Sequence, residues 1–382
     1  MKKSKVQTIC IHEGQLEDGQ YKGAISPLYM ATAYAYDGVD INRYPRYFNT
    51  PNQVGLAKKI AALEGAEKGL IFGSGMAAVS TALLSHLKAG DHVILQEDLY
   101  GGTTNLVVEE FEKFGIEYSF TKGLKKNDFE VLIQNNTKVI YLETPSNPLM
   151  KIVDLKAIAL LARSKGLITM IDNTFASPIN QNPISFGIDV VIHSATKYLG
   201  GHSDILAGAV VGSEKQIELV FQMAKNLGGS LSDYTVWLLE RSIKTLSLRV
   251  EAQNHNALEL AKFLNEKSAV DAVYYPGLES HPDHDLAKSQ MKGFSGMFSF
   301  ELNTSYDLDV FQQNLRLIKP AMSLAGVEST LTIPCKTSHG LLTPEDRIAQ
   351  GIKDNLIRFS SGIEHVDDLK DDINQALKKS KK

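Results

Sequence analysis

LITMIDNTFASPINQNPISFGIDVVIHSATKY, residues 167–198, contains two short apolar runs that are each followed by polar residues. The runs, 167–171 and 189–192, do not alternate with polar positions, which is typical of strands buried on both faces of a parallel sheet. Asp172 ends the first run, and Lys197 follows the second. The carboxyl ends of parallel strands lie at one edge of a sheet, where α/β proteins bind their ligands. We therefore expect a ligand site that includes Asp172 and Lys197.

The surrounding sequence repeats this pattern of strand followed by helix. Further apolar runs predict strands, and helical spacing predicts helices between several of them, one of them capped by Asp154. The expected strands are 69–72, 92–95, 138–142 and 207–211, and the expected helices are 77–88, 106–114 and 155–165. The fold class is therefore α/β, with a mostly parallel central sheet and helices on both faces.

The pattern changes near residue 236, where we expect a second domain of mixed α and β structure. Its expected elements are helices over 230–249 and 252–265, strands at 273–275 and 297–302, and a last helix at 367–378. The first fifty residues are rich in Tyr, Gly and Pro and resemble an extended arm. The predicted division is an arm at 1–50, a main domain at 51–235 and a smaller C-terminal domain at 236–382.

The composition argues against several functional classes. A net charge of −4 over 382 residues leaves no basic surplus for nucleic acid. No apolar run approaches the ~20 residues that span a bilayer, and the N-terminus lacks the apolar stretch of a secretory signal. The only cysteines, Cys10 and Cys335, form no CxxC motif, which favours a reducing compartment. We expect a cytoplasmic protein that binds neither nucleic acid nor membrane.

A glycine-rich turn, FGSGMAA at residues 72–78, joins an expected strand to an expected helix. The amides of Gly75 and Met76 would point at one spot beside the positive end of the helix, which makes an anion site. A simple tight turn is the plainer interpretation. The segment also fits GxGxxA, a dinucleotide-binding fingerprint, with Glu97 and Asp98 as possible ribose ligands.

Asp172 and Lys197 favour one cofactor over the others. An ionised carboxylate and an amine beside an apolar sheet are costly unless each has a partner. Pyridoxal phosphate (PLP) supplies both, because its ring nitrogen pairs with a carboxylate and its aldehyde condenses with a lysine amine. Ser194 and Thr196 add hydroxyl donors for the phosphate. Either residue alone is more simply a turn cap or a solvated lysine, but the combination with the glycine turn predicts PLP.

These segments resemble the Cys/Met-metabolism PLP enzymes, which have the PLP-dependent transferase fold type I. The resemblance covers residues 8–376. The family includes cystathionine γ-synthase, cystathionine β- and γ-lyases, methionine γ-lyase and homoserine-ester sulfhydrylases. The matching motifs are SGMAA (74–78), YGGT (100–103), ETPSNP (143–148), DNTFASP (172–178), HSATKYLGGHSD (193–204) and IRFSSGIE (357–364).

The resemblance implies a role for each matching position. Lys197 is the Schiff-base lysine and proton shuttle, and Asp172 is the partner of the ring nitrogen. Gly75, Met76, Ser194 and Thr196 hold the phosphate. Tyr100 stacks on the ring and acts at the leaving group. Ser323 and Arg358 bind substrate, with Arg358 holding the α-carboxylate, and Asn147 contacts either the cofactor's phenolic oxygen or the substrate carboxylate. Tyr44 and Arg46 bind the cofactor phosphate of a neighbouring subunit, which implies a homo-oligomer, usually a tetramer of two active dimers.

The chain departs from the family pattern in informative places. Met322 stands where γ-acting members often have a glutamate, and Asn105 stands where some have an arginine. Both changes remove charge, so we expect a largely apolar distal pocket at Met322, although a thioether also simply fills space. This favours a carbon–sulfur lyase that eliminates from cystathionine, methionine or a related amino acid. The alternative is γ-replacement on an acylated homoserine, catalysed by a γ-synthase or sulfhydrylase.

Two further interpretations carry less support. A nicotinamide-dependent dehydrogenase would use the glycine turn but leaves Asp172, Lys197 and Arg358 without roles. A catalytically inactive PLP-binding scaffold would lack some of the catalytic positions, and none is missing. His281 and His284 have a spacing like that of metal ligands, but a solvated loop explains them better and we expect no metal.

Overall fold

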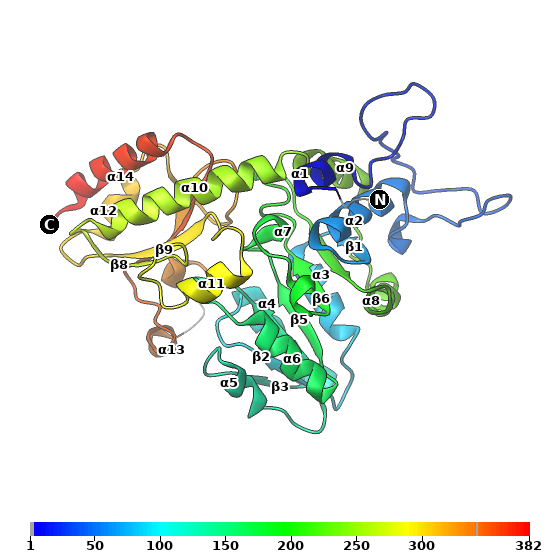
Figure 1. Cartoon of the computed structure of the whole chain (residues 1–382), viewed down its shortest axis with the longest axis horizontal. Coiled ribbons are helices and arrows are strands. Elements are labelled where there is room, and N and C mark those ends of the chain that lie inside the picture. The colour runs from blue at the N-terminus through cyan, green and yellow to red at the C-terminus, as the bar shows by residue number, and fades with distance from the viewer. Residues whose placement is uncertain (1–3, 339, 341–342) are drawn as a thin grey trace.

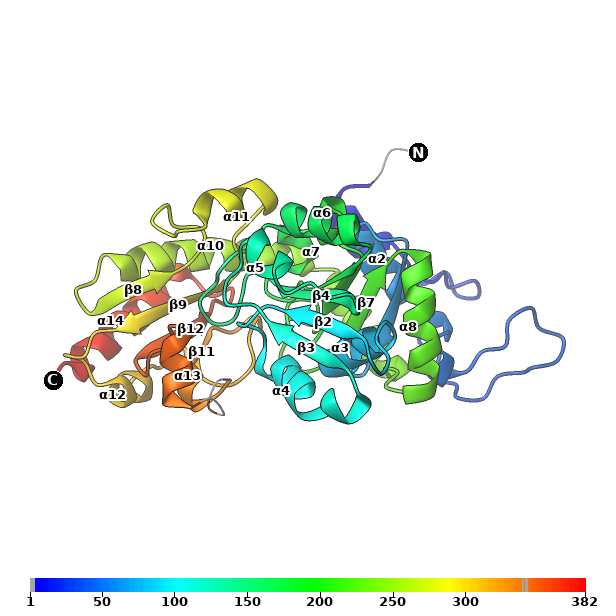
Figure 2. The same cartoon turned by 90° about the horizontal axis from the view of Figure 1, so that it is seen from below.

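Two sheets lie side by side in the computed structural model, which describes residues 4–338, 340 and 343–382 (Figures 1 and 2). The larger sheet has the strand order β1-β7-β6-β5-β4-β2-β3. Its strands are β1 (Lys68–Phe72), β2 (His92–Leu95), β3 (Glu117–Phe120), β4 (Thr137–Glu143), β5 (Ile168–Asp172), β6 (Val190–His193) and β7 (Gly208–Gly212). Strands β6, β5, β4, β2 and β3 are parallel, and β7 is antiparallel to both of its neighbours. The mostly parallel sheet is therefore confirmed.

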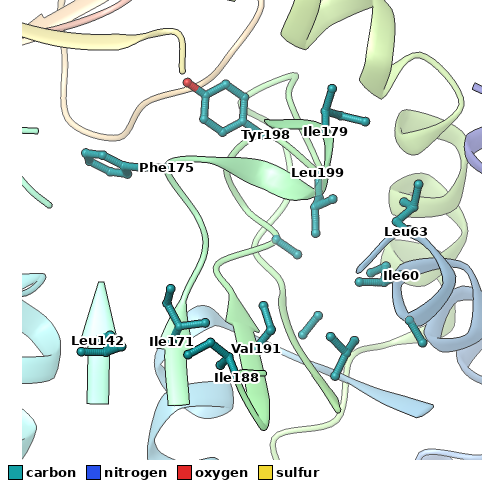
Figure 3. Packing of buried hydrophobic residues seen from close by; sticks show 14 of the residues in the cluster. Ile60, Leu63, Leu142, Ile171, Phe175, Ile179, Ile188, Val191, Tyr198 and Leu199 are labelled. Carbon is teal, nitrogen blue, oxygen red and sulfur yellow. The ribbon is translucent and has the colours of Figure 1, made fainter. Parts of the chain in front are cut away.

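Alternate side chains of the large sheet enter two different hydrophobic clusters. Ile171 and Val191 belong to the cluster on one face, whereas Met170 and Ile192 belong to the cluster on the other. Figure 3 shows side chains of the first cluster, including Ile171 and Val191. Because both faces need apolar residues, the strands read as unbroken apolar runs rather than alternating ones.

Helices cover both faces, as the sequence predicts. The first face packs against α2 (Pro51–Glu64), α5 (Lys126–Glu130), α6 (Leu155–Lys165) and α7 (Ser177–Asn180). The second face packs against α3 (Gly75–Leu84), α4 (Gly101–Glu110) and α8 (Glu214–Leu227). The predicted cap is present, because the Asp154 side chain accepts a hydrogen bond from the Ala157 amide.

The smaller sheet has the order β10-β11-β12-β9-β8. Its strands are β8 (Val270–Tyr274), β9 (Met297–Leu302), β10 (Lys319–Pro320), β11 (Thr330–Thr332) and β12 (Leu356–Ser360), and its helices are α11 (His284–Gln290), α12 (Leu308–Gln313), α13 (Pro344–Ala349) and α14 (Val366–Ser380). The long helix α10 (Leu246–Asn265) lies against β8, β9 and α14, and it also contacts α1 (Val6–His12) (Figure 1).

The helical stretch expected over 230–249 breaks in two. Helix α9 (Asp233–Ile243) ends at Ile243, and α10 begins at Leu246, with Lys244 and Thr245 between them. Arg249 stabilises the break, because its guanidinium donates to the Ser242 carbonyl at 3.0 Å and to the Thr245 hydroxyl at 3.2 Å. Val236 and Leu239 of α9 pack in a cluster of the large sheet. The domain boundary at residue 236 stays a prediction.

Helix α2 was absent from the sequence prediction, although its start carries a clear signal. Thr50 and Gln53 form a capping box, and Pro51 occupies the first helical position. The residues between α1 and the 3₁₀ turn at Pro45–Tyr47 form no helix or strand, and Figure 1 shows them leaving the body as extended loops. In the described part of the chain, no helix is long and apolar enough to cross a membrane.

Candidate active site

Three neighbouring parallel strands end in ionisable residues at the same edge of the large sheet. Glu143 of β4 lies opposite Asp172 of β5, and His193 ends β6 next to it. A cavity of about 520 Å³ opens at this edge. Residues of the smaller sheet and of the loop between β10 and β11 complete the wall, so segments far apart in sequence meet here.

Most of the predicted site residues line this one cavity. Those in its wall are Gly75, Met76, Tyr100, Asn147, Asp172, Ser194, Thr196, Lys197, Met322, Ser323 and Arg358. Tyr44 and Arg46 do not line it. The Arg46 guanidinium donates to the Lys225 carbonyl at 2.6 Å and lies 5.2 Å from the ring centre of Tyr47. Their predicted contact with a neighbouring subunit stays a prediction.

The glycine turn forms a narrow cradle at the start of α3. Ser74 caps the helix by accepting from the Ala77 amide at 3.0 Å. The amides of Gly75 and Met76 precede the first intrahelical bonds, so they remain available for an anion. A Cβ atom at position 75 would lie 2.8 Å from the Ser194 Cβ, so only glycine fits here. The cradle fits a phosphate group held by backbone amides and the Ser194 hydroxyl.

The Thr196 hydroxyl, which was expected to donate a hydrogen bond to the phosphate, is bonded to the protein backbone instead. Its hydroxyl donates to the Ala207 carbonyl at 3.1 Å and accepts from the Ala207 amide at 3.0 Å. This hydrogen bond uses the single hydroxyl proton of Thr196, and it connects the loop that carries Lys197 to the residue just before strand β7. The predicted phosphate contact of Thr196 stays a prediction.

Asp172 is a buried carboxylate, 8% exposed, and it forms no ion pair with any residue in the described ranges. The Thr174 amide donates to it at 2.9 Å. Burial raises the pKa of the Asp172 carboxyl, and the hydrogen bonds from Thr174 oppose that rise. A cation in the cavity would complete this environment, so the site fits a protonated ring nitrogen. Thr174 also accepts from the Ser194 amide at 2.8 Å and was missed by the sequence analysis.

The Lys197 amine lies next to a serine hydroxyl. Its Nζ donates to the Ser323 Oγ at 2.7 Å. Burial and, to a smaller extent, the charge of Arg358 lower the pKa of Lys197 to about 8, and the charge of Asp172 opposes this change. A lysine with this pKa has a substantial neutral fraction near neutrality, which is the form that attacks an aldehyde or accepts a proton.

Arg358 lies in strand β12 and is 6% exposed. Its Nη1 donates to the Asn147 Oδ1 at 3.0 Å, and its Nη2 donates to the Ser323 carbonyl at 3.4 Å. Burial lowers the pKa of Arg358 to about 10, so the guanidinium stays charged at neutral pH. A buried cation held by neutral groups is suited to binding a carboxylate.

Glu143 is a site residue that the sequence analysis did not single out, although it begins the quoted ETPSNP motif. Its Oε2 accepts from the Tyr100 amide at 2.7 Å, which fixes the start of α4. Burial and the charge of Asp172 raise the pKa of the Glu143 carboxyl well above its usual range. Glu143 therefore positions Tyr100, whose side chain is 46% exposed in the cavity wall.

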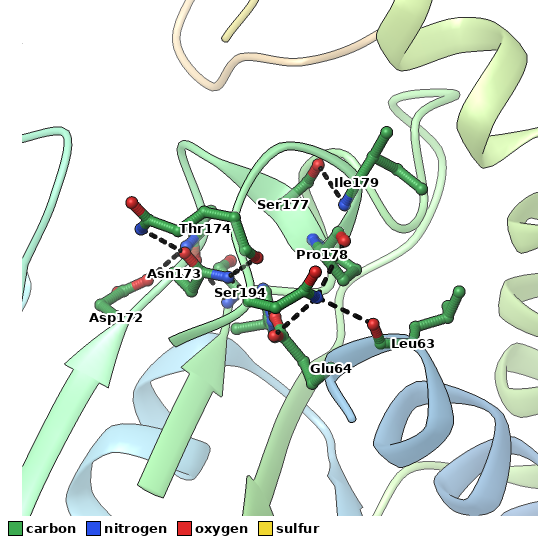
Figure 4. Close-up of polar contacts among 12 residues, drawn as sticks. Leu63, Glu64, Asp172, Asn173, Thr174, Ser177, Pro178, Ile179 and Ser194 are labelled. Carbon is green, nitrogen blue, oxygen red and sulfur yellow. Dashed lines mark hydrogen bonds and ion pairs between the residues drawn. The ribbon is translucent and has the colours of Figure 1, made fainter. Parts of the chain in front are cut away.

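A second buried network supports the strand ends from below (Figure 4). The Glu64 Oε1 lies 2.6 Å from the His193 Nε2 and accepts from the Asn173 amide group at 2.8 Å. Asn173 also donates to the Gln181 carbonyl at 3.0 Å. The network joins α2 to β5 and β6, so it holds the segments that carry Asp172 and Ser194.

Comparisons with known proteins agree with this geometry. Residues 7–378 match the family described as Cys/Met metabolism PLP-dependent enzyme. A cystathionine beta-lyase of Lactococcus lactis subsp. cremoris (strain MG1363) is 43% identical over 380 residues, which cover 98% of this chain and 100% of the relative. A cystathionine gamma-lyase of Bacillus subtilis (strain 168) is 42% identical, with 98% and 99% covered.

A solved structure resembles the whole chain. The crystal structure of cystathionine gamma-lyase from Lactobacillus plantarum complexed with L-serine has a TM-score of 0.95 and 39% sequence identity, and the match covers 99% of each chain. The match includes both sheets, so the likeness extends beyond the cofactor-binding motifs. The chain belongs to the Cys/Met metabolism PLP-dependent enzyme family, and its relatives place it among the carbon–sulfur lyases of that family.

Proposed function

We propose that the chain is a cystathionine lyase that carries PLP on Lys197. The observation that supports this most strongly is the joint placement of Lys197 and Arg358 around Ser323, in one cavity with Asp172. An amine, a carboxylate-binding guanidinium and a buried acid are the groups that an amino-acid lyase of this kind requires. The relatives with 43% and 42% identity are cystathionine lyases, which supports the choice of substrate.

The cradle at Gly75 and Ser194 would hold the cofactor phosphate, and Asp172 would hold the ring nitrogen. When bound there, PLP supplies an aldehyde for the amine and a ring that withdraws electrons from the substrate α-carbon. A nicotinamide dinucleotide is the wrong ligand for the glycine turn, since the chain belongs to a PLP-dependent family. One of its two candidate ribose ligands is also occupied, because Asp98 accepts from the Ser146 hydroxyl at 2.7 Å.

Different residues of the chain would then bind the substrate and transfer its protons. Arg358, oriented by Asn147, would bind the α-carboxylate as a fork. The Lys197 amine would remove the α-proton and return it at a neighbouring carbon, with Ser323 holding the amine by a hydrogen bond. Tyr100 would cover the cofactor ring and donate a proton to the departing sulfur. Glu143 would keep Tyr100 in place through its backbone amide.

The test is to incubate the purified holoenzyme with L-cystathionine and to identify both products. Pyruvate with homocysteine marks β-elimination, and 2-oxobutyrate with cysteine marks γ-elimination. L-methionine, and an acylated homoserine with sulfide, are tested in parallel. We expect cystathionine to have the highest kcat/KM. No keto acid from cystathionine, together with rapid replacement on the acylated homoserine, would identify the chain as a γ-replacement enzyme instead.

A further inference from the structure

Glu97 is an acidic residue in the cavity wall that the proposed chemistry does not use. Its side chain is exposed, and it makes no hydrogen bond or ion pair with any residue in the described ranges. Its neighbour Asp98 is buried and forms an ion pair with Lys151 at 3.4 Å. Asp98 is therefore structural, whereas Glu97 lines the cavity and its carboxylate has no partner among the residues that the structure describes.

The other two acids in the wall are committed to the protein. Asp172 accepts from the Thr174 amide, and Glu143 accepts from the Tyr100 amide. Among the described residues that line the cavity, Glu97 is thus the one carboxylate left for a ligand. Met322 and Asn105, which also line the cavity, carry no charge.

The sheet order separates Glu97 from the reacting end of the site. Glu97 follows the end of β2, and Asp172 ends β5, with β4 between these two strands. Neighbouring strands lie about 4.8 Å apart, so two strand spacings place the two positions about 10 Å apart. The charge of Arg358 lowers the pKa of Lys197, whereas Glu97 is not among the charges that shift the pKa of either residue. Glu97 therefore lies at the distal end of the cavity.

Cystathionine has a second amino-acid group beyond its sulfur atom. Six bonds separate the reacting α-carbon from the distal nitrogen, a reach of about 7 Å in an extended chain of standard bond lengths. This length suits a substrate that reacts at Lys197 and places its distal ammonium near Glu97. Methionine has no charged group at that end, so only cystathionine gains from a carboxylate there.

We propose that Glu97 is the specificity residue that binds the distal ammonium of cystathionine. This rests on the proposed function, because it concerns the same cavity and the same substrate. The predicted apolar distal pocket at Met322 is then incomplete, since the charge that selects cystathionine comes from the loop after β2. A single charged contact at the distal end of the cavity would strengthen substrate binding and leave the rate of the chemical step unchanged.

The test compares Glu97→Gln with the wild-type holoenzyme on two matched substrates. The first is L-cystathionine. The second is its analogue without the distal amino group, which is S-(3-carboxypropyl)-L-cysteine for β-elimination or S-(2-carboxyethyl)-L-homocysteine for γ-elimination. We expect kcat/KM for cystathionine to fall about 5- to 30-fold, between the effects of an exposed ion pair and a charge-assisted hydrogen bond. For the analogue we expect a change below about twofold.

Two further variants separate charge from structure. Glu97→Asp keeps the carboxylate and should retain part of the preference for cystathionine. Glu109→Gln removes an exposed carboxylate of α4 that does not line the cavity, and should change neither substrate. In a Lys197→Ala background, which blocks turnover, calorimetry should show weaker binding of cystathionine by the same factor when Glu97→Gln is added.

The outcomes distinguish the two proposals. If the wild-type enzyme does not cleave cystathionine, the proposed function fails and the role of Glu97 fails with it. If the wild-type enzyme cleaves cystathionine but Glu97→Gln leaves its kcat/KM unchanged, only the role of Glu97 is overturned. An equal fall on cystathionine and on the analogue also overturns it, because the lost contact would not involve the distal ammonium.

Discussion

At the scale of single residues, the environment of Lys197 sets the protonation state of the proposed cofactor lysine. Burial is the larger cause of its lowered pKa of about 8, and the positive charge of Arg358 adds to it. The ordinary pKa of a lysine lies near 10.4. The cavity thus gives the Lys197 amine a substantial neutral fraction near neutral pH, whereas a lysine on the surface would be almost fully protonated.

We expect the rate at which the apoprotein takes up PLP covalently to increase with pH and to level off above about 8. The neutral amine is the reactive form, and its fraction rises through the lowered pKa of Lys197. Absorbance spectroscopy across a pH series measures this rate. Arg358→Gln should move the midpoint to higher pH, because it removes a repelling charge. A midpoint near 10.4 in the wild-type protein would contradict the lowered pKa.

Glu64, which does not line the cavity, should contribute to the free energy of unfolding. Glu64→Ala leaves His193, Asn173 and Asn182 without a shared acceptor in a buried network. We expect the free energy of unfolding to fall by about 3 kcal/mol, whereas Glu64→Gln, which keeps one acceptor oxygen, should cost less. Urea denaturation measures both. Glu13→Gln, at a partly exposed surface position, serves as the control, and equal losses for both Glu64 variants would argue against the network.

At the scale of secondary-structure elements, a buried lysine joins the first two helices. Lys59 of α2 is completely buried, and its Nζ donates to the carbonyls of Cys10 and Ile11 in α1 at 3.0 and 3.1 Å. These carbonyls lie in the last turn of α1, where a positive charge is favourable. Helix α1 lies at the start of the arm and is followed by its extended loops, so Lys59 fixes the point from which these loops leave the body.

Lys59 should make the stability of this attachment depend on pH. Burial lowers the pKa of Lys59 to about 8, below its value in the unfolded chain. Between about pH 8 and pH 10 the unfolded state binds more protons, so the free energy of unfolding contributed by Lys59 rises with pH. The stability difference between wild type and Lys59→Met should therefore grow in favour of wild type by about 2–3 kcal/mol over this range.

The matched control is Lys58→Met on the exposed side of the same helix, where Lys58 forms an ion pair with Glu13 at 3.1 Å. Urea unfolding of the three proteins at pH 7.5, 9 and 10 provides the comparison. The control should show no comparable pH dependence, since Lys58 is solvated in both states. The same slope in Lys59→Met as in wild type would show that another group titrates in this range.

At the scale of the whole molecule, the arm exposes several large apolar side chains. Tyr21 is 80% exposed, Met30 is 62% exposed and Tyr36 is 85% exposed. Exposed apolar groups gathered on one extended segment are typical of a surface that another protein covers. We propose that the arm packs on a second copy of the chain and brings Tyr44 and Arg46 to that copy's cavity.

Mixing two inactive variants tests this assembly. If Arg46 acts across the subunit boundary, Arg46→Ala and Lys197→Ala subunits complement each other, because each hybrid dimer contains one intact site. Random exchange of equal amounts makes half of the dimers hybrid, so roughly a quarter of the wild-type activity should return. Mass spectrometry of the intact complexes verifies the exchange. Hybrids that form but remain inactive would mean that each site belongs to a single chain.

The sequence by itself determined the α/β class, the mostly parallel sheet and the position of the ligand edge. These depend on local features: unbroken apolar runs for buried strands, and polar residues such as Asp172 directly after them. Motif resemblance added residues that local features cannot connect, such as Asn147 and Arg358, which are 211 positions apart and hydrogen-bonded.

Only the tertiary structure decided how the side chains are paired. Thr196 and Ala207, Glu143 and Tyr100, and Lys59 and α1 come together through packing between elements, which no local pattern encodes. The same holds for Glu97 and Asp98, adjacent acids of which one is buried in an ion pair and the other faces the cavity. Burial and partners, rather than residue type, set the charge and the role of each ionisable group, and both depend on the folded arrangement of distant segments.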